Sequence, residues 1–327
     1  MEMKRVLSGM RPTGKTHLGH IHGILENWRS LQDEYECFYF AADWHALTSE
    51  YKNTSVIKES LTEMVVDWLS VGIDPQKSTL FVQSWVKEHA ELHLLLSMVT
   101  PIGWLERNPT YKEQQEELGE KEVGTYGFLG YPVLQAADIL MYKGNYVPVG
   151  RDQLPHLEIT REIARRFSHL YSEVFPLPEA LLAEVPILLG TDSRKMSKSY
   201  NNAIYIADPE DVLEVKIMQM ITDPQRGYRK DPGYPDVCGI FSYHRIYNEP
   251  EVIIEIDREC RRAGIGCTSC KEMLVKKVKE FLAPLQEKRD YFLKHLSEVE
   301  DIIQEGTERA RAVAQNTMNE VREAIGI

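Results

Sequence analysis

The chain has 327 residues, of which 43% are hydrophobic and 27% are charged, and its formal net charge is −12. This composition is that of a globular protein with room for two domains, and the acidic balance excludes a protein that binds nucleic acid over its whole surface. No run approaches the ~20 apolar residues of a membrane span, and the N-terminus lacks the apolar core of a signal peptide, so we expect a cytoplasmic protein that does not enter a membrane.

The first predicted strand covers residues 5–8 and leads through a tight turn, residues 12–20, into a helix. The turn would present backbone N–H groups and the imidazoles of His17 and His20 at the positive end of that helix, where phosphates bind. Gly19 has no Cβ, so a base or a ribose could approach the backbone there. The turn is therefore either a nucleotide site or an ordinary Gly- and His-rich turn, and a second motif is needed to decide.

Strands and helices then alternate along the first half of the chain. We predict strands over 36–43, 78–83 and 146–150 and helices over 55–72, 89–99, 132–142 and 153–170. Alternation of this kind gives a parallel sheet between helices, which predicts a Rossmann-like α/β domain. The segment 111–123 is charged and poorly patterned, so it is either an exposed helix or a loop.

A second polar loop follows a predicted strand over residues 185–189. Residues 190–199 read Gly-Thr-Asp-Ser-Arg-Lys-Met-Ser-Lys-Ser and contain Lys195 and Lys198. Lysine ammonium groups are point charges on flexible stems, so they can stabilise the extra negative charge of a transition state at a phosphate. Together with the first turn, this loop indicates attack on the α-phosphorus of ATP, whose phosphates Mg²⁺ usually bridges.

Beyond residues 207–209 the predicted strands stop. The remaining predicted elements are helices over 211–220, 252–263, 271–292 and 299–325. We therefore expect two domains. Residues 1–205 would form the Rossmann-like catalytic domain, with a helical insertion around 100–180, and residues 206–327 an all-helical domain whose last helix could pack back on the first domain.

The two loops resemble the HIGH and KMSKS signatures of class I aminoacyl-tRNA synthetases, in the order and with the separation of that family. The resemblance implies a catalytic set of His17, His20, Lys195 and Lys198. It also implies an ATP site that comprises Met10, Arg11, Thr13, Gly14, His17, Gly19, His20, Gly150, Asp152, Lys195, Met196, Ser197 and Lys198. The carboxylate of the amino acid would attack ATP directly, so no covalent nucleophile is expected.

Residues 126–140 and 147–153 resemble tryptophanyl-tRNA synthetases, and the likeness extends over essentially the whole chain. In that family the acid of the Ala-Ala-Asp segment, here Asp138, accepts the indole N–H. The resemblance implies a tryptophan site of Leu7, Tyr131, Gln135, Asp138, Val147, Val149 and Gln153. Independently of the family, residues 131, 135 and 138 share one helix face, and a carboxylate among apolar neighbours needs a partner or a function.

Two departures from the family pattern leave alternatives open. Gln135 stands where many bacterial members have Met, and His20 where they have Asn, and both residues bring the site nearer to tyrosyl-tRNA synthetases. Leu7 lies where a tyrosine site would need a second hydroxyl, which favours tryptophan. A related adenylyltransferase and an inactive RNA-binding relative are further alternatives, and the intact lysine loop counts against both.

Four of the five cysteines, Cys238, Cys260, Cys267 and Cys270, form the pattern C-x21-C-x6-C-x2-C. One C-x2-C pair in a reducing compartment already suggests a metal, and four thiolates complete a tetrahedral or cuboidal set. A subset of bacterial tryptophanyl-tRNA synthetases has such cysteines and binds a [4Fe–4S] cluster near the anticodon, and this chain resembles that subset. Zn²⁺ and four reduced core cysteines are the alternatives.

The family resemblance also implies the partners of the chain. These are L-tryptophan, tRNA(Trp) and a second copy of the chain in a homodimer, with the helical domain reading the anticodon. Arg261, Arg262 and Lys271 flank the cysteines and make this region the first candidate for the anticodon face. Three other basic groups could face RNA: Arg161, Arg165 and Arg166; Arg226, Arg229 and Lys230; and Lys276, Lys277 and Lys279.

Overall fold

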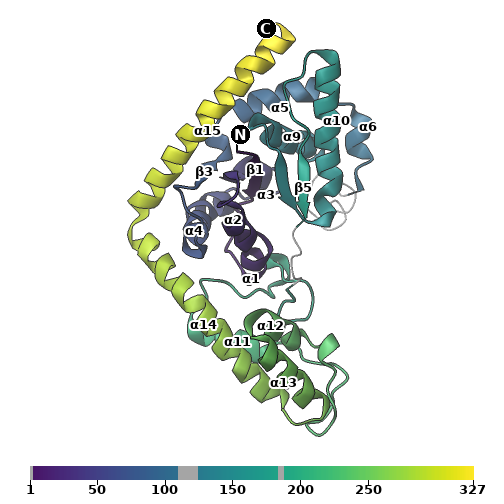
Figure 1. Ribbon diagram of the computed structural model, residues 1–327, viewed down its shortest axis with the longest axis vertical. Coiled ribbons are helices and arrows are strands. Elements are labelled where there is room, and N and C mark those ends of the chain that lie inside the picture. The colour runs from purple at the N-terminus through teal and green to yellow at the C-terminus, as the bar shows by residue number, and fades with distance from the viewer. Residues whose placement is uncertain (1–2, 110–123, 183–187) are drawn as a thin grey trace. The chain divides into compact units, whose positions relative to one another are not determined.

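The computed structural model describes residues 3–109, 124–182 and 188–327, and the chain divides into two compact units (Figure 1). The first unit comprises Met1–Gly14, Glu26–Val185 and His295–Ile327, and the second comprises Lys15–Leu25 and Pro186–Lys294. The units therefore do not follow the single boundary near residue 205 that the sequence suggests. The assignment of catalysis to residues 1–205 and of anticodon binding to residues 206–327 stays a prediction.

The first unit is built on a five-stranded sheet in the order β3-β2-β1-β4-β5. Its strands are β1 (Arg5–Met10), β2 (Glu36–Ala41), β3 (Ser78–Val82), β4 (Tyr146–Val149) and β5 (Glu179–Leu182). All neighbouring strands pair in parallel, and β1 and β2 keep register from Arg5↔Glu36 to Met10↔Ala41. The side chains of β2 are buried from Cys37 onward, as expected for a central strand of a parallel sheet. The predicted Rossmann-like sheet is confirmed.

The last strand of the sheet lies earlier in the chain than the sequence predicts. β5 reads Glu-Ala-Leu-Leu at the sheet edge and is half-exposed, so it lacks the long apolar run of a buried strand. In the predicted strand 185–189, residues 185–187 lie outside the described residues, and Leu189 forms only an isolated antiparallel bridge with Lys195. The ambiguous segment 111–123 also lies outside the described residues.

Helices surround this sheet in the first unit. They are α2 (Glu26–Leu31), α3 (Asp43–Glu50), α4 (Ser55–Val71), α5 (Glu88–Val99), α6 (Ile102–Glu106), α8 (Tyr126–Leu129), α9 (Tyr131–Met141), α10 (Leu154–Leu170) and α15 (Leu296–Ile325). Every residue of α9 except Gln135 is buried, and α9 packs against both α5 and α10. The final helix, α15, packs along β3 and α5. A helix as buried as α9 places its polar side chains inside the protein.

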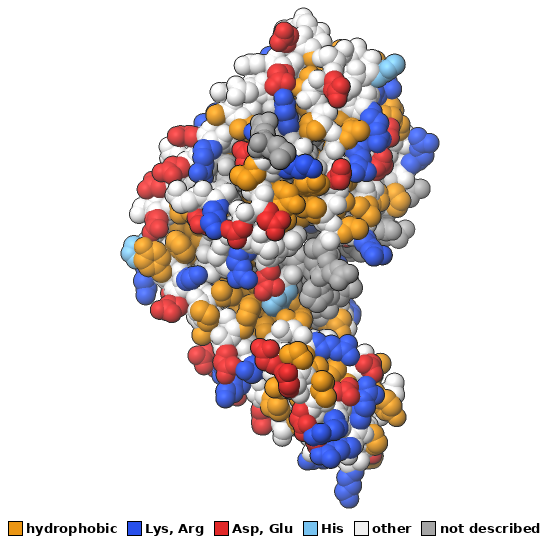
Figure 2. Space-filling view, viewed as in Figure 1, with side chains coloured by type: hydrophobic (Ala, Val, Ile, Leu, Met, Phe, Trp, Pro, Cys, Tyr) orange, Lys and Arg blue, Asp and Glu red, His pale blue; other side chains and the backbone are white. Residues whose placement is uncertain are grey.

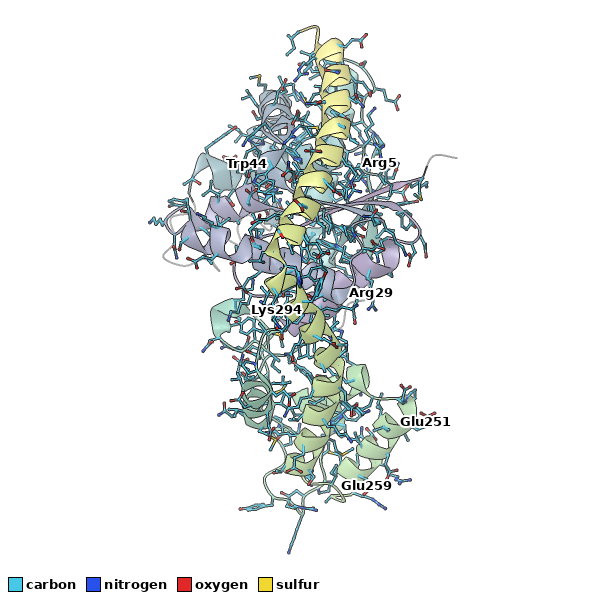
Figure 3. The ribbon with its side chains drawn as sticks, turned by 90° about the vertical axis from the view of Figure 1, so that its left-hand side faces the viewer. Arg5, Arg29, Trp44, Glu251, Glu259 and Lys294 are labelled. Atoms are coloured by element: carbon cyan, nitrogen blue, oxygen red, sulfur yellow. The ribbon has the colours of Figure 1, made fainter. Side chains whose placement is uncertain are left out.

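The second unit is helical apart from its loops. Its helices are α1 (Leu18–His20), a π-helical turn (Ile21–Leu25), α11 (Glu210–Gln219), α12 (Gly239–Tyr247), α13 (Pro250–Arg261) and α14 (Cys267–Lys294). Figure 3 labels Glu251 and Glu259 on α13 and Lys294 at the end of α14. α12 was not predicted, and it packs on α14 by burying Ile240 and Tyr243. Within the three described ranges, no helix is long and apolar enough to cross a membrane.

Candidate active site

Asp138 lies on α9 with 1% of its surface exposed, and three side chains surround its carboxylate. Oδ1 is 2.6 Å from Nδ1 of His89 and 2.8 Å from Nε2 of Gln83. Oδ2 is 2.8 Å from Nε2 of His45 and 2.9 Å from Nε2 of Gln83. These partners come from α5, from the turn after β3 and from α3, so three separate elements converge on one acid.

The surroundings of Asp138 decide its charge. Burial alone would raise the pKa of this carboxyl, but hydrogen bonds from His45 and His89 outweigh burial and lower the pKa to about 2. Asp138 is therefore ionised at neutral pH, and an ionised carboxylate only accepts hydrogen bonds. A ligand group that only donates, such as a ring N–H, fits this acceptor.

Tyr131, one of the predicted amino-acid ligands, lies beside this carboxylate. Its hydroxyl is 2.7 Å from Nε2 of His156 on α10, and its ring meets the ring of His45 edge-on with centroids 6.3 Å apart. Because His45 also contacts Asp138, the structure connects Tyr131 and Asp138 through one imidazole.

The apolar residues of the predicted tryptophan site belong to the core of the same unit. Leu7 and Val147 are buried in one cluster with Ile139 of α9, and Val149 packs against that cluster. The two glutamines are half-buried, and Gln153 donates to the carboxylate of Asp152 at 3.0 Å. The predicted residues from β1, α9 and β4 thus lie in the first unit, as the sheet order requires.

Part of the predicted ATP set also lies in the first unit. Met10 ends β1, and the backbone N–H of Thr13 then donates to the carbonyl of Arg11 at 2.9 Å, which closes a turn. Gly14 has a φ of +109°, a conformation that side chains other than glycine rarely adopt. Gly150 and the exposed Asp152 follow β4. The tight turn predicted after the first strand is present.

The two imidazoles of the first motif lie in the second unit. The rings of His17 and His20 stack with centroids 3.6 Å apart, and the backbone N–H of His17 donates to Nδ1 of His20 at 3.2 Å. A Cβ on Gly19 would come within 3.0 Å of the His17 ring, so glycine permits this close approach.

Both imidazoles are uncharged at neutral pH. Burial, followed by the positive charge of Lys198, lowers the pKa of His17 to about 4. Burial and the neighbours His17 and Lys198 lower the pKa of His20 as well. The imidazoles can therefore offer hydrogen bonds to phosphates, while the positive charge has to come from the lysines.

The second unit joins the two motifs, although almost 180 residues of sequence separate them. The backbone N–H of Leu18 donates to the carbonyl of Ile204 at 2.9 Å, and that of Ile206 to the carbonyl of Thr16 at 3.1 Å. Met196 is buried, and its Cβ lies 3.8 Å from the place where a Cβ of Gly19 would be. The structure thus brings the Met of the lysine loop onto the glycine of the first motif.

Asn202 organises the lysine loop from within. It is buried, and its Oδ1 accepts the backbone N–H of Ser197 at 2.8 Å. Its amide donates to Oδ1 of Asp192 at 2.7 Å and to the carbonyl of Lys195 at 3.2 Å. The loop backbone is therefore fixed, while Lys195 is exposed and Lys198 half-buried.

The four predicted metal ligands lie near one another in the second unit. Cys238 precedes α12, Cys260 lies in the last turn of α13, and Cys267 and Cys270 lie in the first turn of α14. Burial, followed by the nearness of the other three cysteines, raises the pKa of the Cys270 thiol to about 12. In the described part of the chain, no three His, Cys, Asp or Glu side chains form a group that could hold a metal ion. The metal assignment therefore stays a prediction.

Known proteins match this chain along its whole length. The family model described as "tRNA synthetases class I (W and Y)" matches residues 2–283. The chain belongs to this family. A tryptophan–tRNA ligase from Thermotoga maritima is 54% identical over 325 residues, or 99% of each chain. One from Aquifex aeolicus is 45% identical over 99% of this chain and all of that protein. This family membership removes the adenylyltransferase alternative.

Solved structures of the synthetase family share the fold. The tryptophanyl-tRNA synthetase of Campylobacter jejuni, complexed with ADP and tryptophan, has a TM-score of 0.90 at 36% identity, over 99% of this chain and 100% of that one. A tyrosyl-tRNA synthetase from Archaeoglobus fulgidus, complexed with L-tyrosine, has a TM-score of 0.68 at 20% identity, over 88% of this chain and 90% of that one. The second likeness concerns the fold alone.

The structure adds site residues that the predicted synthetase set lacks. They are His45, Gln83, His89 and Tyr142 around Asp138, His156 behind Tyr131, and Asn202 inside the lysine loop. A signal for two of them was present, because His45 and Gln83 follow the carboxyl ends of neighbouring parallel strands, where ligands of open α/β sheets bind. His89 and Asn202 carry no such signal, since each is one polar residue in an otherwise ordinary helix or loop.

Proposed function

We propose that this chain is a tryptophan–tRNA ligase. It activates L-tryptophan with ATP to tryptophanyl-adenylate and diphosphate, then transfers the tryptophanyl group to the terminal adenosine of tRNA(Trp) and releases AMP. The observation that carries the proposal is the buried, ionised carboxylate of Asp138, together with full-length relatives that bear this name. We place the enzyme in the cytoplasm, where L-tryptophan and tRNA(Trp) meet.

The choice of tryptophan over tyrosine rests on the chemistry of this acceptor. An indole N–H only donates, so one carboxylate satisfies it, whereas a phenol hydroxyl donates and also accepts. Leu7 of β1 is buried and apolar, so it offers no second hydroxyl and instead suits the larger indole ring. Tyrosine in this pocket would leave its hydroxyl half satisfied, and such a mismatch is worth a factor of ~10³ or more between substrates.

The activation step needs positive charge at the phosphates of ATP. Since His17 and His20 are neutral, we assign that charge to Lys195 and Lys198 and assign hydrogen bonding to the imidazoles. Mg²⁺ that enters with ATP would add positive charge at the phosphates. The backbone of the loop that carries the lysines is held by Asn202, so the loop keeps both ammonium groups near one place, from which their stems can follow the phosphate into the transition state.

The four cysteines support a bound [4Fe–4S] cluster, with Zn²⁺ as the alternative. The donor set consists of four thiols, each of which interacts electrostatically with the other three. A Cβ on Gly233 would clash with Sγ of Cys260, so the backbone lies close around the sulfurs. Nη1 of Arg226 lies 3.8 Å from Sγ of Cys267 and 4.0 Å from Sγ of Cys260, where it can balance the negative charge of thiolates. Such a cluster would fix the loops that join α12, α13 and α14.

We infer that the second unit reads the anticodon, through a different basic group from the one first considered. Arg261 pairs with Asp236 and Asp257, and Arg262 pairs with Glu259, so these charges are already engaged. Lys and Arg side chains gather at the lower end of Figure 2, the end of the second unit beyond α13 in Figure 1. In the same unit, the segment 228–230 exposes Tyr228, Arg229 and Lys230, a combination that suits stacking and phosphate contacts with single-stranded RNA.

A second copy of the chain is the partner that fits the exposed apolar side chains of α5 and α6. Leu94 and Met98, four residues apart on α5, are 54% and 70% exposed, and Ile102 of α6 is 63% exposed. A Met98→Glu variant should sediment as a monomer at concentrations where the unchanged chain is a dimer. Dimers of both proteins would contradict this placement of the interface.

The proposed activity is tested most simply by ATP–diphosphate exchange with each of the twenty amino acids, followed by charging of tRNA(Trp). Tryptophan alone should support rapid exchange. Exchange with tyrosine at the same rate would overturn the assignment of the substrate.

A further inference from the structure

His89 is a buried histidine with no role yet in the proposed activity. It lies on α5, is 0% exposed, and contacts two residues: Asp138 within α9, and Tyr142, which caps the C-terminal end of that helix. Its Nδ1 is 2.6 Å from Oδ1 of Asp138, and its Nε2 is 2.7 Å from the hydroxyl of Tyr142. Asp138 and Tyr142 are four residues apart, so one imidazole from α5 spans one turn of α9.

The two contacts determine which ring nitrogen of a neutral His89 imidazole carries the proton. Asp138 is an ionised acceptor, so Nδ1 of the imidazole must donate to it. In the neutral imidazole Nε2 is then an acceptor, and the Tyr142 hydroxyl donates to it. Tyr142 thus selects the tautomer that presents an N–H to Asp138, an assignment that follows from the hydrogen-bond network.

Aromatic rings enclose this pair. The centroids of Phe40 and Phe81 lie 6.2 Å and 6.1 Å from that of His89, and Phe38 stacks on Tyr142 with centroids 4.8 Å apart. These side chains come from β2 and β3 and exclude water, which strengthens a hydrogen bond to a carboxylate. His89 bonds Asp138, and Tyr142 bonds His89, so we assign both a role through the carboxylate of Asp138.

The three partners of Asp138 are not equivalent. Gln83 and His89 are both 0% exposed; His89 contacts Oδ1, and the amide of Gln83 contacts both oxygens. The side chain of His45, which contacts Oδ2, is 12% exposed and is the most accessible of the three. A carboxylate has about four acceptor positions, two on each oxygen, and here each oxygen already has two partners. An incoming donor would therefore reach Oδ2 by taking the place of His45, the partner with the most exposed side chain.

We propose that His89 and Tyr142 are positioning residues for substrate selection: they fix Oδ1 of Asp138 so that Oδ2 receives the indole N–H of tryptophan. This inference rests on the proposed role of Asp138 as the indole acceptor. Without the Nδ1–H of His89, Oδ1 keeps only Gln83 as a donor, so the carboxylate is held less firmly.

The test compares tryptophan with β-(benzothiophen-3-yl)alanine, in which sulfur replaces the N–H, in ATP–diphosphate exchange. His89→Leu should lower the ratio of the two kcat/KM values by about 10- to 100-fold, the usual loss when the outer partner of a functional group is removed. The change should appear in KM for tryptophan, with KM for ATP unchanged. His89→Asn places an amide N–H near the position of Nδ1 and should restore most of the ratio, and Tyr142→Phe should lower it less than His89→Leu.

Tyr39→Phe is the matched control. Tyr39 of β2 is as buried as Tyr142, but its hydroxyl donates to the backbone carbonyl of Trp28, so its loss should leave the ratio unchanged. An unchanged ratio in a folded His89→Leu protein, or in Tyr142→Phe if His89→Leu does not fold, would overturn the inference. So would an equal rise in KM for ATP, because a merely structural role has that effect.

Asp138→Asn separates this inference from the function on which it rests. If Asp138→Asn abolishes the preference for tryptophan while His89→Leu and Tyr142→Phe keep it, only the positioning role is wrong. If Asp138→Asn keeps the preference, Asp138 is not the acceptor of the indole N–H. That result would overturn both the proposed role of Asp138 and the positioning role of His89 and Tyr142.

Discussion

The carboxylate of Asp138 and the lysine loop show two ways of holding a charge. Asp138 is buried and bonded by three side chains from three elements of the first unit. In the second unit, Asn202 fixes the backbone of the loop, but Lys195 is exposed and Lys198 half-buried. A group that selects a substrate has to stay in one place, because a displaced acceptor no longer distinguishes ligands. A group that stabilises a transition state needs its charge near the reacting phosphate, and a long lysine stem can follow that phosphate.

The comparison predicts that the largest effect on selectivity comes from the buried charge. Asp138→Ala should remove most of the preference for tryptophan over tyrosine, a change of ~10³ or more in the ratio of kcat/KM. Exchange kinetics with both amino acids measure this ratio. Asp67→Asn, at a similarly buried aspartate on α4, is the control and should keep the preference. A tryptophan rate untouched by Asp138→Ala would show that selection lies elsewhere.

The next largest effect should come from the loop, and it should concern rate rather than selectivity. Lys198→Ala should slow adenylate formation by on the order of 10²–10³, the usual result of removing one preorganised charge, with little change in ground-state ATP binding. Rapid-quench measurements of adenylate formation check the rate constant. Lys276→Ala, which removes an exposed lysine of α14, should behave like the unchanged protein. Equal rate constants in the unchanged protein, Lys198→Ala and Lys276→Ala would show that Lys198 has no catalytic role.

The sequence predicts the strands of the sheet and the importance of Asp138 better than it predicts the contacts around Asp138. The strands through β4 follow from apolar runs, and the acid among apolar neighbours in residues 136–140 already marks Asp138 as unusual. The positions of His45 and Gln83 after neighbouring strands gave a signal for two partners of Asp138, but their contacts with it could not be predicted. His45, Gln83 and His89 are 93, 55 and 49 residues away and meet Asp138 only when the sheet forms. The edge strand β5 was missed because it is short and half-exposed.

A smaller effect concerns stability: His17 and Asp138 lose their contributions to the free energy of unfolding at different pH values. The folded-state pKa of His17, about 4, is below its ordinary value of 6.5, so the unfolded chain binds more protons. The stability that this group contributes is complete above pH 6.5 and is lost as the pH falls toward 4, at ~1.4 kcal/mol per pH unit. Asp138, with a pKa of about 2 against an ordinary 3.8, loses its contribution only between those two values.

Urea unfolding at pH 7 and pH 5 measures this difference. The loss of unfolding free energy on acidification should be smaller for His17→Asn than for the unchanged chain, whereas Asp138→Asn should leave the loss as it is. An identical loss in His17→Asn would mean that His17 is not held neutral by burial.

The smallest expected effect on activation comes from the cysteines. Cys267→Ser should leave tryptophan-dependent exchange unchanged and weaken tRNA charging, because the cysteines belong to the α12–α14 region of the second unit, whereas Asp138 belongs to the first unit. Protein purified without oxygen should contain about four irons per chain. One zinc per chain, or no metal, would remove the iron–sulfur assignment, and Cys37→Ser is the control, since Cys37 is a core residue of β2.

The central claim is that Asp138 governs which amino acid binds while Lys198 governs how fast the bound amino acid reacts. Single-turnover adenylate formation, followed over a range of tryptophan concentrations, tests this claim directly. Asp138→Asn should raise the tryptophan concentration at half-maximal rate and largely keep the maximal rate constant, and Lys198→Ala should do the reverse. Variants that change the same parameter, or a Lys198→Ala protein that binds tryptophan weakly but reacts at the full rate, would contradict this division of roles.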